Sequence, residues 1–150
     1  MRRELHVAPF FFVYLTSCIV FRMTDIVLKQ ESYNIIGVCL RVYEELGGGF
    51  LESVYGKAIE KEFKLSGIPF EKQVKLNIQY KGEDLGKYFI ADFVVYGKII
   101  LEIKAVSYLV NQHLSQTLNY LKATDTRLGL VVNFGNVKFQ YRRVLNSSLR

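Results

Sequence analysis

The sequence is poor in the residues that ligate soft or borderline metals. It has two cysteines, Cys18 and Cys39, and two histidines, His6 and His113, with no CxxC or related spacing. A zinc site built from Cys and His ligands needs three or four of them at defined spacings, so such a site is close to excluded. Any metal would have oxygen ligands, which suit Mg²⁺ or Mn²⁺. So few cysteines also fit a reducing cytosol.

Prolines are equally scarce, and no linker, internal repeat or low-complexity tract divides the chain. Two prolines occur in 150 residues, and half of the residues are hydrophobic. This is enough for one domain with a sizeable core. Lys and Arg number 20 against 14 Asp and Glu, which gives a net charge of +6. The basic balance favours a polyanionic partner without identifying it.

The sequence has no apolar run of full membrane-spanning length, but its beginning comes near to one. Arg2 and Arg3 precede an uncharged apolar run over residues 7–21, the outline of a signal peptide. That run is short for a membrane span, and residues 15–18 have the form of a lipoprotein cleavage box although residues 19–21 continue the apolar run. Export or membrane anchoring through residues 1–22 is therefore one alternative.

We prefer the interpretation that Met23 is the true start. Residues 1–22 would then be an upstream extension or a disordered appendage, and residues 23–150 would form the domain. Removing residues 1–22 leaves a net charge of +4, so the basic balance survives. This interpretation predicts a cytoplasmic protein and disfavours a membrane partner.

Hydrophobic periodicity predicts three helices and five strands in the order ααβββαββ. The expected helices cover residues 32–46, 51–66 and 111–124, with Ser32 as N-cap of the first and Gly47 at its end. The inner side of the second helix is expected to carry Leu51, Val54, Ala58, Ile59 and Leu65. Strands are expected from Val74 to Tyr80, over residues 88–95, 99–105 and 128–134, and from Val137 to Val144. This order describes a single α/β domain with a mixed sheet flanked by helices.

Three charged residues interrupt the two central strands. Odd positions from 89 to 95 and from 99 to 105 are apolar, so they should share one dry face, while Asp92, Glu102 and Lys104 stand on the other. A three-residue loop over residues 95–97, with Gly97 left-handed, would pair Asp92 with Ile100 and put Glu102 diagonally across from Asp92. One divalent ion could then bridge both carboxylates.

The simpler alternative is a cross-strand ion-pair cluster on a solvated face. Ile90, Val94 and Ile100 flank the charges, however, and indicate a partly covered face. Charged groups among apolar neighbours are costly unless they are paired or bind a metal. The pattern therefore favours a metal-dependent phosphodiesterase site.

Further motifs give a resemblance to a known family. Residues 49–55, Gly-Phe-Leu-Glu-Ser-Val-Tyr, match the pattern that names the GxxExxY protein family, and residues 32–144 resemble that family in order and spacing. The other matching elements are residues 91–93, residues 101–105 and the Gln-x-x-x-Tyr element of Gln116 and Tyr120. The family belongs to the PD-(D/E)XK nuclease superfamily, so the resemblance implies a restriction-endonuclease-like core.

The resemblance also implies a role for each matching residue. Asp92 and Glu102 would hold Mg²⁺ or Mn²⁺, with the backbone carbonyl of Ile103 as a further ligand, and Glu52 would bind the ion directly or through water. Lys104 would orient or help deprotonate the attacking water and offset charge at the phosphate. Gln116 and Tyr120 share one helix face and would contact phosphate or position the lysine. An ordinary polar helix edge is the alternative for this pair, and core packing is the alternative for Tyr55.

These observations predict a divalent-metal-dependent nuclease that hydrolyses phosphodiester bonds of DNA, with RNA as a second option. The alternative is a non-catalytic module that binds nucleic acid or a protein partner and retains the nuclease fold. A domain of this size also leaves room for a homodimer or a partner protein that helps to grip the substrate. Neither the target nor the mode of attack, internal or from an end, follows from the sequence.

Overall fold

The computed structural model of the chain describes residues 10–135 and 137–149, with side chains from residue 28 onward. Within this range the elements follow the predicted order ααβββαββ. The helices are α1 (Phe10–Leu46), α2 (Glu52–Leu65) and α3 (Asn111–Ala123). The strands are β1 (Phe70–Tyr80), β2 (Glu83–Val95), β3 (Ile99–Lys104), β4 (Leu128–Asn133) and β5 (Gln140–Leu145).

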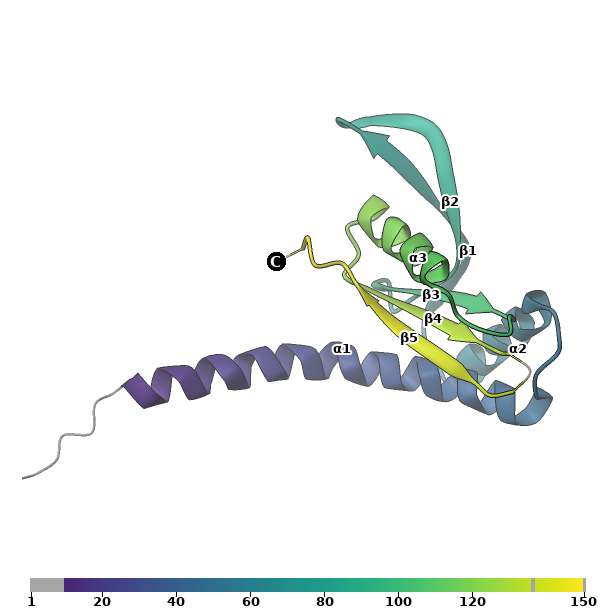
Figure 1. Cartoon of the computed structure of the whole chain (residues 1–150), viewed down its shortest axis with the longest axis horizontal. Helices are drawn as coiled ribbons and strands as arrows, with labels where there is room; N and C mark the ends of the chain where they lie inside the picture. Colours follow the sequence, from purple (N-terminus) through teal and green to yellow (C-terminus); the bar gives the residue numbers. More distant parts are fainter. Residues whose placement is uncertain (1–9, 136, 150) are drawn as a thin grey trace, which may run out of the picture.

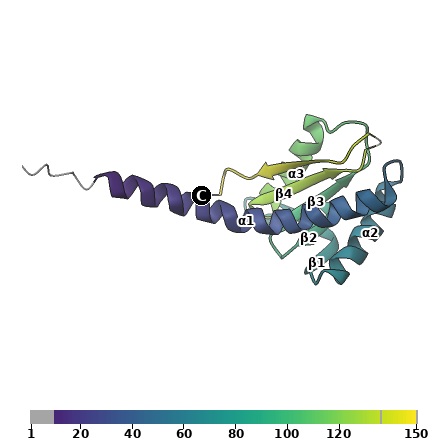
Figure 2. The same cartoon turned by 90° about the horizontal axis from the view of Figure 1, so that it is seen from below.

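The strands form one mixed sheet in the order β1-β2-β3-β4-β5. β3 and β4 are parallel and the other neighbours are antiparallel. Parallel neighbours need a crossover connection, which α3 supplies between β3 and β4. Helices α1 and α2 lie on one face of the sheet and α3 on the other, and the far half of the β1–β2 hairpin rises past α3 (Figures 1 and 2). The predicted fold class, a mixed sheet flanked by helices, is confirmed.

Each helical layer covers its own apolar cluster. The larger cluster lies between α1, α2 and the sheet, and it includes Val38, Ile59 and Leu130. The smaller cluster lies under α3 and includes Leu121 and Ile100. β3 and β4 are buried on both faces, because successive residues of a strand point to opposite sides and both sides are covered. β3 is therefore a rigid base for the charged residues it carries.

Helix α1 begins well before the predicted start at Ser32. It runs from Phe10 to Leu46, and the hydroxyl of Ser32 donates to the carbonyl oxygen of Leu28 at 2.6 Å, inside the helix. The prediction of an N-cap was wrong because no Gly or Pro lies between Phe10 and Ser32 to stop the helix, and a mid-helix serine can bond back to the preceding turn. The end is as predicted, since Gly47 has φ 68° and its N–H donates to the carbonyl of Tyr43.

The predicted boundary between residues 22 and 23 lies inside α1, and residues 1–9 lie outside the described part of the chain. The division into residues 1–22 and 23–150 stays a prediction, as does the choice of Met23 as the start. Over the side chains that the structure describes, none of the helices is both long enough and apolar enough to cross a membrane.

Helix α2 turns a partly different face to the core than the sequence predicted: Ile59 is buried and Ala58 packs against the core, as expected, but the rest of the inner face differs. Its buried residues include Tyr55, Ile59 and Phe63, which are spaced four apart. Three residues that were expected inside are exposed instead, at 75%, 38% and 71% for Leu51, Val54 and Leu65. The row of Tyr55, Ile59 and Phe63 carries two aromatic rings, and it buries more apolar area than a face with Leu51 and Leu65 would. This difference decides which face of the helix packs on the sheet.

The β2–β3 loop has the predicted three residues but is shifted by one position. Val95 pairs with Ile99, so the loop is residues 96–98, and Gly97 is left-handed with φ 68° as expected. Val95 is fully buried, which keeps it in the strand. The observed register places Asp92 opposite Glu102 rather than opposite Ile100. The two carboxylates are closer neighbours than predicted.

The odd positions of β2 do not share one dry face. Phe93 packs in the cluster beneath α1 and α2, whereas Ala91 packs in the cluster beneath α3. Between them, Asp92 faces Gln73 of β1, and these two are skipped in the β1–β2 ladder although their neighbours on both sides are paired. Gln73 has φ 53°, a conformation that changes the direction of the strand. Asp92 therefore stands at a kink where β2 changes face.

Candidate active site

Asp92 and Glu102 meet where the regular pairing of β2 and β3 ends. Glu102 Oε1 accepts a hydrogen bond from the N–H of Asp92 at 3.2 Å, and Asp92 Oδ2 accepts one from the N–H of Ile103 at 2.7 Å. Each carboxylate is thus tied to the backbone of the other strand. The two residues that the sequence singled out first are held side by side.

Burial makes this carboxylate pair costly to ionise. The Glu102 side chain belongs to a residue only 4% exposed, and burial, followed by repulsion from Asp92, raises the pKa of Glu102 to about 8. Burial also raises the pKa of Asp92, while the N–H of Ile103 and the charge of Lys104 act in the opposite direction. A cation close to both groups would remove the repulsion between them and favour two charged carboxylates.

Glu52 approaches this pair from the first turn of α2. Its Oε1 accepts a hydrogen bond from the N–H of Ala105 at 3.3 Å, directly after β3, and its charge raises the pKa of both Asp92 and Glu102. Among the side chains that the structure describes, those of residues 28–135 and 137–149, however, no three of His, Cys, Asp or Glu converge closely enough to enclose a metal ion. Glu52 is within electrostatic reach of the pair rather than in contact with it.

Tyr55 fixes the loop that leads into Glu52. Its side chain is fully buried and stacks on Phe134 with 4.2 Å between ring centroids. Its hydroxyl donates to the carbonyl of Gly47 at 2.6 Å and accepts from the N–H of Phe50 at 3.2 Å. The tyrosine is therefore a core residue that closes the glycine-rich turn, in agreement with the packing interpretation.

Lys104 connects the sheet to α3 through a chain of hydrogen bonds. Lys104 Nζ donates to Gln116 Oε1 at 3.4 Å, and Gln116 Nε2 donates to the hydroxyl of Tyr120 at 2.9 Å. Burial, followed by the charge of Glu102, raises the pKa of Tyr120, which places this phenol near the carboxylates. Gln116 and Tyr120 are thus gathered with Lys104, so the plain helix-edge alternative does not describe them.

A cleft of about 730 Å³ opens beside the carboxylates, and Glu52, Asp92 and Ile103 line it. The N–H of Ile103 points toward Asp92, and the N–H and C=O of one strand residue point to the same edge, so the carbonyl of Ile103 also faces β2. The atoms of Glu52, Asp92 and Ile103 that could bind a metal ion here are all oxygen atoms. This donor set suits Mg²⁺ or Mn²⁺ and not a soft metal.

Two residues at the site were missed from the sequence. Gln73 Nε2 donates to Asp92 Oδ1 at 3.5 Å, and nothing in the strand pattern marks this glutamine. Asn133 is fully buried at the end of an otherwise apolar strand, which is a signal that could have been noticed. Its amide accepts from the N–H of Val106 at 3.0 Å and donates to the carbonyl of Val106 at 2.9 Å. Asn133 thereby anchors the segment after Lys104.

His113 has a structural contact. Its Nδ1 accepts a hydrogen bond from the N–H of Val110 at 3.2 Å, at the beginning of α3. This contact caps the helix that carries Gln116 and Tyr120, so His113 supports the site from a distance and takes no place within it.

Comparison with known proteins identifies the superfamily of the chain. A family model described as "PD-(D/E)XK nuclease superfamily" matches residues 29–144. The chain belongs to this superfamily, whose members are usually nucleases that use divalent metal ions. The finer assignment to the GxxExxY family stays a prediction.

Structural comparison gives the same fold. A solved structure titled "Crystal structure of SSO0001" superposes with a TM-score of 0.50 and 18% sequence identity, covering 63% of this chain and 50% of that chain. At this identity the likeness shows the fold alone, and this chain matches only about half of the length of that protein. A search of the curated proteins gives no significant match.

Proposed function

We propose that this protein is a divalent-metal-dependent nuclease that hydrolyses phosphodiester bonds of DNA, with RNA as the alternative substrate. The observation that carries the proposal is the pairing of Asp92 with Glu102 at the end of the β2–β3 ladder, with Lys104 held beside them. Membership of a superfamily of nucleases supports it. The net charge of +6 suits a polyanionic substrate.

The residues fit a hard divalent ion, Mg²⁺ or Mn²⁺. Asp92 and Glu102 would hold it with their carboxylates and Ile103 with its backbone carbonyl, while Glu52 would act through a bound water or as an outer ligand. Mg²⁺ commonly uses one or two protein carboxylates and keeps several waters, so the absence of a third converging carboxylate among the described residues is no obstacle. When bound, the ion would polarise the phosphate and make water a better nucleophile.

The other side chains would act on the water and on the phosphate. Lys104 carries a positive charge at the edge of the carboxylate pair, where it would orient the attacking water and offset negative charge that develops on the phosphate. Gln116 accepts from the ammonium group of Lys104 and is itself held by Tyr120, so these two residues would fix the position of that group. No separate base is required from His113.

The proposal is tested by cleavage of end-labelled single-stranded DNA, double-stranded DNA and RNA with Mg²⁺, Mn²⁺ or EDTA. We expect cleavage only with a metal ion and its loss in Lys104→Ala. Lys122→Ala, an exposed lysine on α3, is the control for a general loss of charge. Equal activity of the two lysine variants would contradict the role of Lys104, and the product ends would distinguish internal from terminal attack.

The same assay decides the alternative. If the wild type and Lys104→Ala bind nucleic acid equally and neither cleaves it under any metal condition, the protein is a binding module with a retained nuclease fold. A cytoplasmic location and a homodimer or partner protein remain part of the proposal, and mass determination of the native protein together with cell fractionation would check both.

A further inference from the structure

The cleft of the candidate active site is lined by lysines as well as by carboxylates. Lys57 from α2 and Lys72 from β1 line the same cleft as Glu52 and Asp92, which lies between α2 and the β1–β2 hairpin. The cleft thus joins the candidate metal ligands to a positively charged region. The mechanism proposed above makes no use of these lysines.

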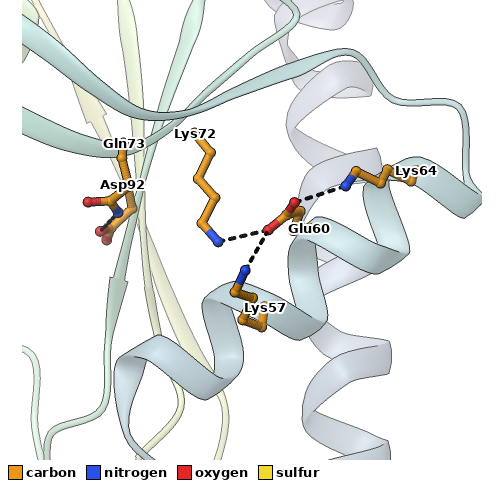
Figure 3. Close-up of polar contacts among 6 residues, drawn as sticks. All are labelled: Lys57, Glu60, Lys64, Lys72, Gln73 and Asp92. Carbon is orange, nitrogen blue, oxygen red and sulfur yellow. Dashed lines mark hydrogen bonds and ion pairs between the residues drawn. The ribbon is translucent and has the colours of Figure 1, made fainter.

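The lysines are gathered by one glutamate of α2. Glu60 binds Lys72 at 2.8 Å and Lys64 at 2.9 Å, and Lys57 lies at 3.8 Å (Figure 3). Hydrogen bonds from Lys72 and Lys64 lower the pKa of Glu60 to about 2, so it stays charged at neutral pH. Three ammonium groups around one carboxylate leave a local surplus of two positive charges.

The three lysines are not equivalent. Lys72 is 27% exposed and lies between Glu60 and the pair formed by Gln73 and Asp92, so it is already positioned beside the cleft (Figure 3). Lys64 is 65% exposed, lies on the far side of Glu60 and does not line the cleft. Both Lys72 and Lys64 contact Glu60, but only Lys72 lines the cleft.

The backbone of β1 explains how Lys72 reaches the cleft. Successive residues of a regular strand point to opposite faces, yet Lys72 and Gln73 both line this cleft. Gln73 has φ 53°, a costly conformation for a residue other than glycine, and it breaks the alternation at this point. The same irregularity brings the amide of Gln73 to Asp92, where it donates a hydrogen bond. Lys72, the preceding residue, is thereby placed next to the carboxylates along the cleft.

We propose that Lys57 and Lys72 form a phosphate subsite, which holds a nucleic-acid backbone phosphate flanking the scissile one. This inference rests on the proposed nuclease function and adds to it the side of the site along which the substrate strand runs. Lys72 is the main contact because it is held in place beside the cleft, and Lys57 is the more exposed contact. A lysine ammonium group binds phosphate oxygens as a compact point charge, so it does not need the fixed bidentate geometry that an arginine uses.

The test compares Lys72→Gln with Lys64→Gln in the full-length chain. Both variants remove one ammonium group from Glu60, but only the first removes it from the cleft. Binding to a labelled DNA oligonucleotide is measured in EDTA over a range of salt concentrations, so that cleavage cannot interfere. We expect Lys72→Gln to weaken binding and to reduce the slope of log K against log salt by about one, while Lys64→Gln leaves the slope unchanged.

Equal slopes for the two variants, or no binding by the wild type, would overturn the subsite. Glu60→Gln is a second check, since it keeps every lysine and removes the competing carboxylate, and it should bind more tightly than the wild type. Unfolding midpoints confirm that each variant is folded. Because binding is measured without metal, a wild type that binds with the expected difference but never cleaves would defeat the nuclease proposal and leave the subsite intact.

Discussion

Glu102 shows most clearly how the fold prepares the site. Its side chain comes from β3, which is buried on both faces, and it lies against a second carboxylate. The protein therefore keeps at this point a group that is unfavourable to ionise without a counter-ion. Such groups are found at functional sites more often than in structural cores.

The pH dependence of stability tests this property in the metal-free protein. The folded-state pKa of Glu102, about 8, lies above the ordinary value of 4.5 for a glutamate, so the folded state binds the proton more tightly than the unfolded state does. The stabilisation of the folded state by the proton on Glu102 is complete below about pH 4.5 and is lost as the pH rises through 8. The loss in the free energy of unfolding is on the order of a few kcal/mol. Urea unfolding of wild type and Glu102→Gln in EDTA at pH 5 and pH 8 should show this loss in the wild type and much less of it in the variant.

Addition of Mg²⁺ at pH 8 should raise the stability of the wild type and leave Glu102→Gln unchanged, because a ligand stabilises only the state that binds it. An identical pH dependence in both proteins would show that Glu102 is not the group that titrates.

Tyr55 gives a prediction about the residue that closes the turn before α2. Tyr55→Phe removes a hydroxyl that makes two hydrogen bonds, to Gly47 and from Phe50, while the stacked ring stays in place. We expect a loss of about 1–3 kcal/mol in the free energy of unfolding, because the part-buried N–H of Phe50 loses its acceptor and the carbonyl of Gly47 loses its donor. Tyr108→Phe, at a residue 75% exposed, is the matched control and should be neutral.

At the scale of elements, α2 is the sharpest test of packing. Phe63 is fully buried on the ridge with Tyr55 and Ile59, whereas Leu65, two residues later, is 71% exposed. Phe63→Ala should cost about 3–5 kcal/mol in the free energy of unfolding, and Leu65→Ala should stay within about 0.5 kcal/mol. Denaturant unfolding of both variants measures this, and similar losses would mean that the helix turns the leucine face inward after all.

The link between β3 and α3 gives a prediction about activity. Gln116→Leu removes the acceptor of the Lys104 ammonium group and the donor to Tyr120. We expect kcat to fall roughly 10- to 100-fold, as is usual when a residue that orients a catalytic group is lost. Gln112→Leu, one turn earlier on an exposed position of α3, is the control. A fall of the same size in both variants would contradict a positioning role for Gln116.

The elements differ in how far the sequence could predict them. Their order followed from periodicity, and the end of α1 at Gly47 followed from the need for a left-handed residue. The start of α1 did not, because Ser32 has the residue type of an N-cap but bonds inside the helix. The β2–β3 register was wrong by one position, since the loop length alone does not decide whether Val95 belongs to the strand or to the loop.

On the scale of the whole molecule, the site draws on all three layers. Glu52 comes from the layer of α1 and α2, the carboxylate pair and Lys104 from the sheet, and Gln116 with Tyr120 from α3 on the other face. The site residues could be named from the sequence because their types and spacing form a motif. The cleft with Lys57 and Lys72 could not, because it depends on the kink at Gln73 and on how α2 packs beside β1.

The most direct test of the account is Mg²⁺-dependent cleavage of a labelled DNA by wild type and Asp92→Asn, at equal concentration and with matching circular dichroism spectra. The change removes one carboxylate charge from the cleft and keeps the size of the side chain. We expect that the wild type cleaves, that EDTA stops the cleavage, and that the variant is slower by roughly 100-fold or more. Cleavage that persists in EDTA, or that is equal in the two proteins, would contradict it.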